Sequence, residues 1–142
     1  MSSLPPTPEN MSRKQILDAI RRGASLESVD LRGVDLSGIS FDNLDMRDAK
    51  LAEANCTRCS FRNANLTGAS LWHANLKDAV LDGANLENAD LDFANMDGVS
   101  LKGAKIKKTI FPLKGEKIEQ IREAAKSGRK LRMDTKGLEE DG

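Results

Sequence analysis

Apolar residues recur at every fifth position through most of this chain. A second series lies two residues before each of these positions, and its members are small or apolar except Thr109. The positions between the two series are mostly Asp, Asn, Ser, Lys, Arg and Gly. The first series comprises Leu26, Leu31, Leu36, Phe41, Met46, Leu51, Cys56, Phe61, Leu66, Leu71, Leu76, Leu81, Leu86, Leu91, Met96, Leu101, Ile106 and Phe111.

A period of five fits neither regular secondary structure. An α-helix repeats every 3.6 residues and a β-strand every two, so neither could keep both series on its buried side. The chain must therefore turn a corner in each repeat, with two residues facing inward and three facing solvent. We expect a single domain, because 142 residues are too few for two comfortable ones.

The individual repeats read ANLTG, ASLWH, ANLKD, ANLEN and ADLDF. They resemble the A(D/N)LXX units of the pentapeptide-repeat family. The resemblance implies an all-β solenoid, a right-handed quadrilateral β-helix with four repeats in each coil. The repeats would then make about four and a half coils, roughly 20 Å tall at about 4.8 Å per coil.

With four repeats in a coil, residues twenty apart should lie in neighbouring coils. This register places opposite charges side by side, as in Asp42 with Arg62 and Glu27 with Arg47. It also predicts that Phe41 stacks on Phe61. On another face it predicts a ladder of side-chain amides formed by Asn55, Asn75 and Asn95.

The two ends carry helical signals. Ser12 and Gln15 have the spacing of a helix-capping box, and Pro112 interrupts the repeats before a second segment with helical periodicity. Because a solenoid exposes its core at both ends, we expect a short helix to cap each one. The predicted segments are an extended or disordered stretch over 1–10, an N-terminal capping helix over 11–23, the β-helix over 24–112, a C-terminal helix over 113–128, and a C-terminal tail or arm over 129–142.

The charge and composition of the chain argue against two classes of function, nucleic-acid binding and membrane insertion. The 22 basic and 22 acidic residues cancel, which removes the positive field of a protein that binds nucleic-acid phosphates. No apolar run is long enough to span a bilayer, and the first residues lack the features of a secretory signal. We expect a cytoplasmic protein without membrane or direct nucleic-acid contact. Incorporation into a secretion apparatus or a virus particle stays open.

Cys56 and Cys59 have the CxxC spacing of a redox pair or of half a zinc site. Both fall in the inward series, so we interpret them as core residues. The chain has one histidine and no second cysteine pair, and we therefore expect no metal and no cofactor. It also has no phosphate-binding glycine loop, carboxylate dyad or catalytic triad, which predicts that it is not an enzyme.

Three ring side chains are the candidate partner-binding residues. Trp72 and His73 occupy outward positions, and Phe93 follows His73 by twenty residues, so the three should cluster on one face. A contiguous aromatic patch is typical of a binding hot spot or of a self-association surface, here a homodimer. The alternative is that the termini of the chain cover the rings.

An acidic stretch is a second candidate surface. It carries six acids and no basic residue: Asp78, Asp82, Glu87, Asp90, Asp92 and Asp97. Quinolone-resistance members of the family mimic DNA and occupy the DNA-binding saddle of type II topoisomerases such as gyrase. Basic residues among the other repeats, including Arg47, Arg58 and Arg62, work against a continuous anionic surface. We therefore favour a rigid protein-protein interaction or structural module, with topoisomerase inhibition or protection as the alternative.

Overall fold

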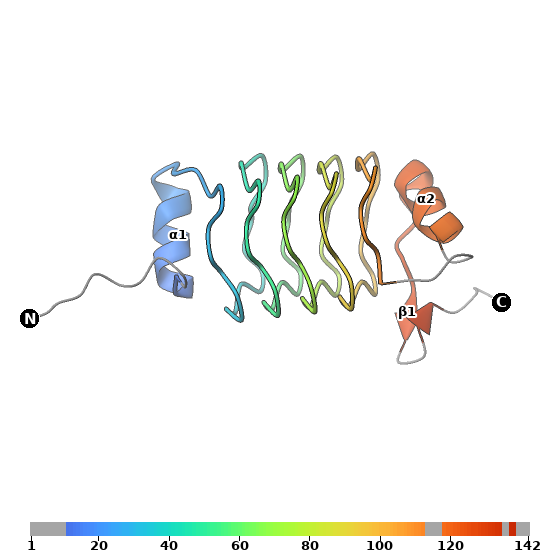
Figure 1. Ribbon diagram of the computed structural model, residues 1–142, viewed down its shortest axis with the longest axis horizontal. Helices are drawn as coiled ribbons and strands as arrows, with labels where there is room; N and C mark the ends of the chain where they lie inside the picture. The colour runs from blue at the N-terminus through green and yellow to red at the C-terminus, as the bar shows by residue number, and fades with distance from the viewer. Residues whose placement is uncertain (1–10, 113–117, 135–136, 139–142) are drawn as a thin grey trace, which may run out of the picture.

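The structure is a solenoid of stacked square coils between two helices (Figure 1). The computed structural model describes residues 11–112, 118–134 and 137–138. Helix α1 (Arg13–Arg21) precedes the coils, and helix α2 (Ile118–Ser127) follows them, with the short strands β1 (Met133–Asp134) and β2 (Gly137–Leu138) after it. The predicted extended stretch over 1–10 and the first residues of the predicted C-terminal helix, 113–117, lie outside the described residues.

Each five-residue repeat forms its corner with local hydrogen bonds. The N–H of the small residue donates to the carbonyl of the central residue three positions earlier, as from Ala64 to Phe61 at 3.1 Å. Where an Asp or Asn precedes the central residue, its side chain accepts a hydrogen bond from the N–H two residues later, as Asn65 Oδ1 does from Thr67 at 3.1 Å. Side chains that replace a backbone acceptor in this way favour turns over helices and sheets. The local bonds therefore explain the A(D/N)L preference of the repeats.

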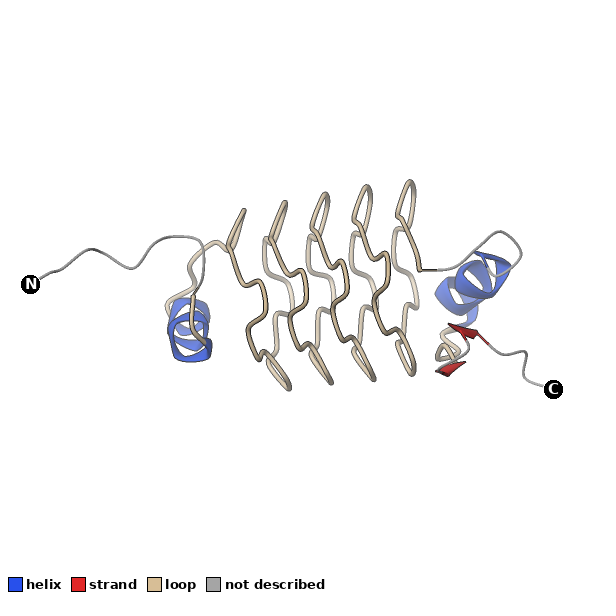
Figure 2. Cartoon of the chain, turned by 60° about the horizontal axis from the view of Figure 1, so that its bottom comes forward, coloured by secondary structure: helices blue, strands red, loops and turns tan. Residues whose placement is uncertain are grey.

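Successive coils are joined through their backbones. Parallel bridges connect residues twenty apart, such as Asn65 with Asn85. Around this bridge, Leu66 N–H donates to the Asn85 carbonyl at 2.8 Å and Asn85 N–H donates to the Ala64 carbonyl at 2.9 Å. Figure 2 shows the resulting stack of coils. The predicted twenty-residue register is therefore confirmed.

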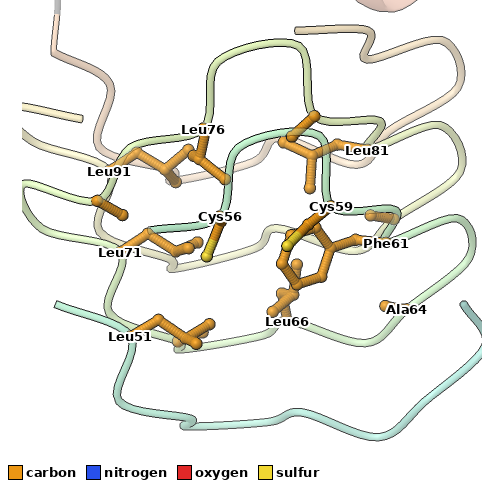
Figure 3. Packing of buried hydrophobic residues seen from close by; sticks show 14 of the residues in the cluster. Leu51, Cys56, Cys59, Phe61, Ala64, Leu66, Leu71, Leu76, Leu81 and Leu91 are labelled. Atoms are coloured by element: carbon orange, nitrogen blue, oxygen red, sulfur yellow. The ribbon is translucent and has the colours of Figure 1, made fainter. Parts of the chain in front are cut away.

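The two inward series form one continuous core. Every central residue from Leu26 to Leu101 is buried, and so are the small partners in the middle coils, while Ile106 near the C-terminal end is half-buried. The rings of Phe41 and Phe61 stack as predicted, with centroids 5.1 Å apart and planes 8° from parallel. Figure 3 shows the stacked columns of leucines around Phe61.

The cysteines are core residues, as predicted. Cys56 and Cys59 are buried free thiols, and both lie among the leucines in Figure 3. Cys59 Sγ donates to the Leu36 carbonyl at 2.9 Å. The hydrogen bond with Cys59 and burial together raise the pKa of the Cys56 thiol, which keeps it protonated. Within the described ranges, no group of three or more His, Cys, Asp or Glu side chains could hold a metal ion.

Of the two predicted pairs of opposite charges in neighbouring coils, one forms an ion pair and the other does not. Glu27 and Arg47 form the expected ion pair at 3.6 Å. The Asp42 carboxylate, in contrast, accepts from the backbone N–H of Arg62 at 2.8 Å, and the Arg62 guanidinium donates to Ser60 Oγ at 3.2 Å. A backbone donor is already fixed in place by the coil, whereas a guanidinium must lose side-chain entropy to reach the same acceptor.

The predicted ladder of Asn side chains is also wrong. Asn55 Nδ2 does reach Asp35 in the coil below at 3.3 Å. The amide oxygens of Asn55, Asn75 and Asn95 instead accept backbone N–H groups within their own turns, each at 3.1 Å. These asparagines are joined across coils by their backbones, because their side-chain oxygens already serve the turn.

Helix α1 lies against the first coil. Ser12 and Gln15 form a capping box, in which Ser12 Oγ accepts from Gln15 N–H at 3.1 Å and Gln15 Oε1 accepts from Ser12 N–H at 2.8 Å. Ile16 and Ala19 are buried in the common core. The Arg13 guanidinium donates to the Asp35 carbonyl at 3.1 Å, so it supplies a donor to the edge of the first coil.

The segment from residue 118 onward lies against the last coil. Ile121 and Ala124 of α2 are buried in the core, and the Gly103 N–H donates to the Ala125 carbonyl at 2.8 Å.

Neither described helix is long and apolar enough to cross a lipid bilayer.

Part of the predicted C-terminal tail is not a free arm. Leu131 is buried, its N–H donates to the Val99 carbonyl at 2.9 Å, and its carbonyl accepts from the Gly98 N–H at 2.7 Å. The last coil has a backbone edge that would otherwise lack partners, and an added extended segment satisfies it. Strands β1 and β2 follow as an antiparallel pair.

Asp30 makes the stability of the solenoid dependent on pH. Its buried carboxylate accepts two hydrogen bonds from Arg32, at 2.9 and 2.7 Å, and these hold its pKa below the ordinary value of an aspartate. A depressed pKa contributes stability above the pKa of the unfolded chain, about 3.9 for aspartate, and this contribution is lost as the pH falls through the folded pKa.

We therefore expect the free energy of unfolding to decrease as the pH falls below about 4. Asp30→Asn should be less stable than the wild type at neutral pH and should lose less stability on acidification. Urea unfolding at neutral and acidic pH measures both effects, with Asp78→Asn at an exposed turn as the control. An equal acid-induced loss in Asp30→Asn and the wild type would refute the role of this pair.

Candidate functional site

The candidate site lies at the corner that follows Leu31, Leu51, Leu71 and Leu91 in successive coils. Trp72 and His73 are the two residues that turn this corner in the third of these coils, so their side chains project outward. Hydrogen bonds hold the backbone in place there. The His73 N–H donates to the Asp92 carbonyl at 3.0 Å, and the Ala74 N–H donates to the Leu71 carbonyl at 2.9 Å. The side chains therefore project from a rigid support.

The structure brings the three predicted rings together. Trp72 meets the His73 ring edge-on, with centroids 4.2 Å apart and planes at 65°. His73 stacks on Phe93 at 5.0 Å and 14°, and Trp72 lies 6.2 Å from Phe93. Trp72 is 39% exposed and Phe93 is 62% exposed, so the described parts of the termini leave this ring cluster accessible to solvent.

Phe93 has an unfavourable backbone conformation. Its φ is +61°, in the left-handed region, where a bulky side chain is an outlier. The conformation costs roughly 1–2 kcal/mol for a residue other than glycine, and asparagine tolerates it best. Other repeats place Gly33, Asn43 or Asn88 at the equivalent turn position, and some place larger polar residues there, such as Glu53 and Arg58, whereas Phe93 is apolar. Because Phe93 is also mostly exposed, burial offsets little of this energy, which points to a use for the ring outside the fold.

Two acidic residues neighbour the ring residues in the coil register. Glu53 lies twenty residues before His73, and its N–H donates to the Trp72 carbonyl at 2.8 Å. Asp92 lies twenty residues after Trp72, and its Oδ1 accepts from the Phe93 N–H at 3.1 Å. Our sequence reasoning missed Glu53 and did not connect Asp92 with the rings, although the twenty-residue register would have identified both.

The six acids of the second candidate surface encircle a coil and do not gather on one face. Asp92 lies with the rings, Asp78 and Asp97 share the next corner, and Asp82 and Glu87 occupy the other two corners. Some of these carboxylates also serve the fold. Asp82 Oδ1 accepts from the Lys102 N–H at 3.2 Å, and Asp90 Oδ1 accepts from the Asp92 N–H at 2.9 Å.

Comparisons with known proteins agree with this architecture. A family described as pentapeptide repeats matches in eight copies, over residues 22–55, 45–83 and 74–111. None of the curated proteins matches the chain. Among solved structures, the chain is similar to pentapeptide repeat proteins, whose fold is a right-handed β-helix solenoid.

Three of these structures indicate how far the likeness extends. Rfr23 of the cyanobacterium Cyanothece is 32% identical with a TM-score of 0.59, over 60% of this chain and 58% of its own. HetL of Nostoc, involved in heterocyst differentiation regulation, is 35% identical with a TM-score of 0.62, over 63% of this chain and 41% of its own. A protein of the Arabidopsis thaliana thylakoid lumen is 27% identical with a TM-score of 0.53, over 70% and 85%. The chain thus spans about half the length of the first two.

Proposed function

Because this chain belongs to the pentapeptide repeat family, we propose that it is a non-enzymatic, rigid module that binds another protein through the ring cluster. The observation that carries the proposal is Phe93, a mostly exposed ring kept in a costly backbone conformation and stacked on His73. Aromatic side chains dominate binding hot spots, and a rigid support lowers the entropy lost on binding.

The ends of the solenoid are less suited to docking than this corner. Helix α1 covers the first coil, and α2 together with Leu131 covers part of the last coil. We infer that both helices act as caps, because an uncovered coil edge would pair with a second copy. Binding then uses the side of the solenoid, where outward residues vary without disturbing the inward columns. A cytoplasmic setting, or a place in a larger assembly, remains a prediction.

Inhibition of a type II topoisomerase by DNA mimicry is the less favoured alternative. Mimicry requires a continuous anionic face, whereas the acids here surround one coil and alternate with arginines in others. We expect the purified protein to leave supercoiling by gyrase unchanged at micromolar concentration. Inhibition in that assay would favour the alternative.

Site-specific photocrosslinking tests the proposed module. Replacing Phe93 with benzoylphenylalanine keeps a ring at the site, and the same replacement at Asn63 places it on the opposite corner of the solenoid. In cells of the source organism we expect a discrete protein adduct from position 93 and none from position 63. Adding Trp72→Ala should reduce the adduct without unfolding the chain. Identical adducts from both positions, or none from either, would disprove the proposal.

A further inference from the structure

The partner contacts the ring cluster with arginine side chains. We propose this from the charges around the cluster, and the inference rests on the proposed function above. Glu53 and Asp92 neighbour the ring residues in the coil register, so we expect an arriving group to meet both aromatic rings and carboxylates. Three rings alone could bind any apolar side chain of a partner. Two neighbouring carboxylates make a positively charged side chain the favoured one.

The position of each carboxylate follows from the coil register. Glu53, His73 and Phe93 hold the same turn position in successive coils, which are about 4.8 Å apart. Glu53 therefore occupies the coil next to His73 on the side away from Phe93. Asp92 holds the same position as Trp72 in the next coil and neighbours Phe93 in sequence. The two acidic residues thus hold diagonally opposite positions in the register around the ring residues.

No ion pair with a described residue neutralises either carboxylate. In the described part of the structure, Glu53 and Asp92 take part in no ion pair. Some coil acids do pair with an arginine, as Asp45 does with Arg47 at 2.7 Å, whereas others, such as Asp48 and Asp78, form no ion pair with a described residue. Glu53 and Asp92 belong to this second group, and they differ from its other members in lying next to exposed rings.

Among the described residues of this corner, the basic one is Arg32. Arg32 lies two coils below Trp72, and its guanidinium forms an ion pair with Asp30 at 2.7 Å. From Asp78 to Asp97 the chain also carries six acids and no base. A cationic partner is thus attracted to the whole coil and is then held at the rings.

Arginine fits this arrangement better than other side chains. Its guanidinium is planar, stacks on aromatic faces and donates several hydrogen bonds to carboxylates in a fixed geometry. Lysine offers a smaller, more strongly hydrated charge that stacks poorly. An aliphatic partner would remove water from Glu53 and Asp92 without replacing their hydrogen bonds, which is unfavourable.

The composition of the chain supplies a direct reporter. Trp72 is the single tryptophan, there is no tyrosine, and His73 is the single histidine. Fluorescence of the full chain therefore reports on Trp72, and the imidazole NMR signals report on His73. The probes are a short peptide of alternating arginine and serine and a matched peptide of lysine and serine.

We expect the arginine peptide to change Trp72 fluorescence and shift the His73 signals, with an affinity roughly fivefold higher than that of the lysine peptide. The double variant Glu53→Gln/Asp92→Asn should weaken this binding by roughly tenfold. The matched control Asp78→Asn/Glu87→Gln removes the same charge from the same region at other corners. Its affinity should stay within about twofold of the wild type.

Three outcomes of the fluorescence and NMR titrations would overturn the inference: equal weakening by both double variants, equal affinity for the two peptides, or self-association that buries Trp72 without peptide. The first indicates diffuse electrostatic attraction, the second a generic cation, and the third a second copy as the occupant. A specific crosslink from position 93 in cells, without binding of the arginine peptide, would refute this inference while leaving the proposed module intact.

Discussion

Deletion of Thr67 alone is expected to prevent the solenoid from folding, whereas deletion of residues 51–70 should leave a shorter folded solenoid. Without Thr67, every later residue moves one position along the repeat, so that Trp72, Lys77 and Asp82 would replace leucines in the inward column. Removing residues 51–70 excises one whole coil and joins Lys50 to Leu71. Leu31 and Leu71 then stack in the same register as before.

The two deletions should differ by more than 5 kcal/mol in the free energy of unfolding, because charged side chains without partners are very costly in a core. Circular dichroism and urea unfolding of both proteins measure the difference. The twenty-residue deletion serves as the control for shortening the chain. Similar unfolding midpoints for the two proteins would contradict the stacked-coil register on which the site depends.

Phe93→Asn should weaken partner binding by at least about tenfold and yet stabilise the protein slightly. Asparagine adopts φ near +60° more easily than phenylalanine, which relieves roughly 1 kcal/mol of backbone strain. Loss of the stacking contact with His73 removes about 0.5 kcal/mol, because this ring pair is exposed. The free energy of unfolding should therefore rise by about 0.5 kcal/mol, while the affinity for the partner falls.

Thermal unfolding and titration with the arginine peptide measure the two effects separately. Asn88→Phe is the reciprocal variant, because Asn88 has a φ of +61° at another corner. It should lower stability by about 1 kcal/mol and leave peptide binding unchanged. If Phe93→Asn instead unfolded at a lower temperature than the wild type, Phe93 would be a structural residue of the coil and its strain would carry no functional meaning.

The sequence by itself determined the coil, the register and the meeting of the rings. Whether a side chain points inward or outward depends on hydrogen bonds within one turn, such as that from the Ala64 N–H to the Phe61 carbonyl. These bonds involve only residues that are close in sequence. The four repeats per coil that the resemblance to pentapeptide-repeat proteins implies then place residues twenty apart in neighbouring coils. The stacking of Phe41 on Phe61 and the position of Phe93 beside His73 were therefore predictable.

Only the tertiary structure decided how outward groups choose among several partners within reach. The Asp42 carboxylate selects the backbone N–H of Arg62 over its guanidinium, and Leu131 pairs with Val99 although no repeat connects them. The same holds for the lack of an ion pair between Glu53 or Asp92 and any described residue. Such choices depend on distances between segments far apart in the chain, which no periodic pattern encodes.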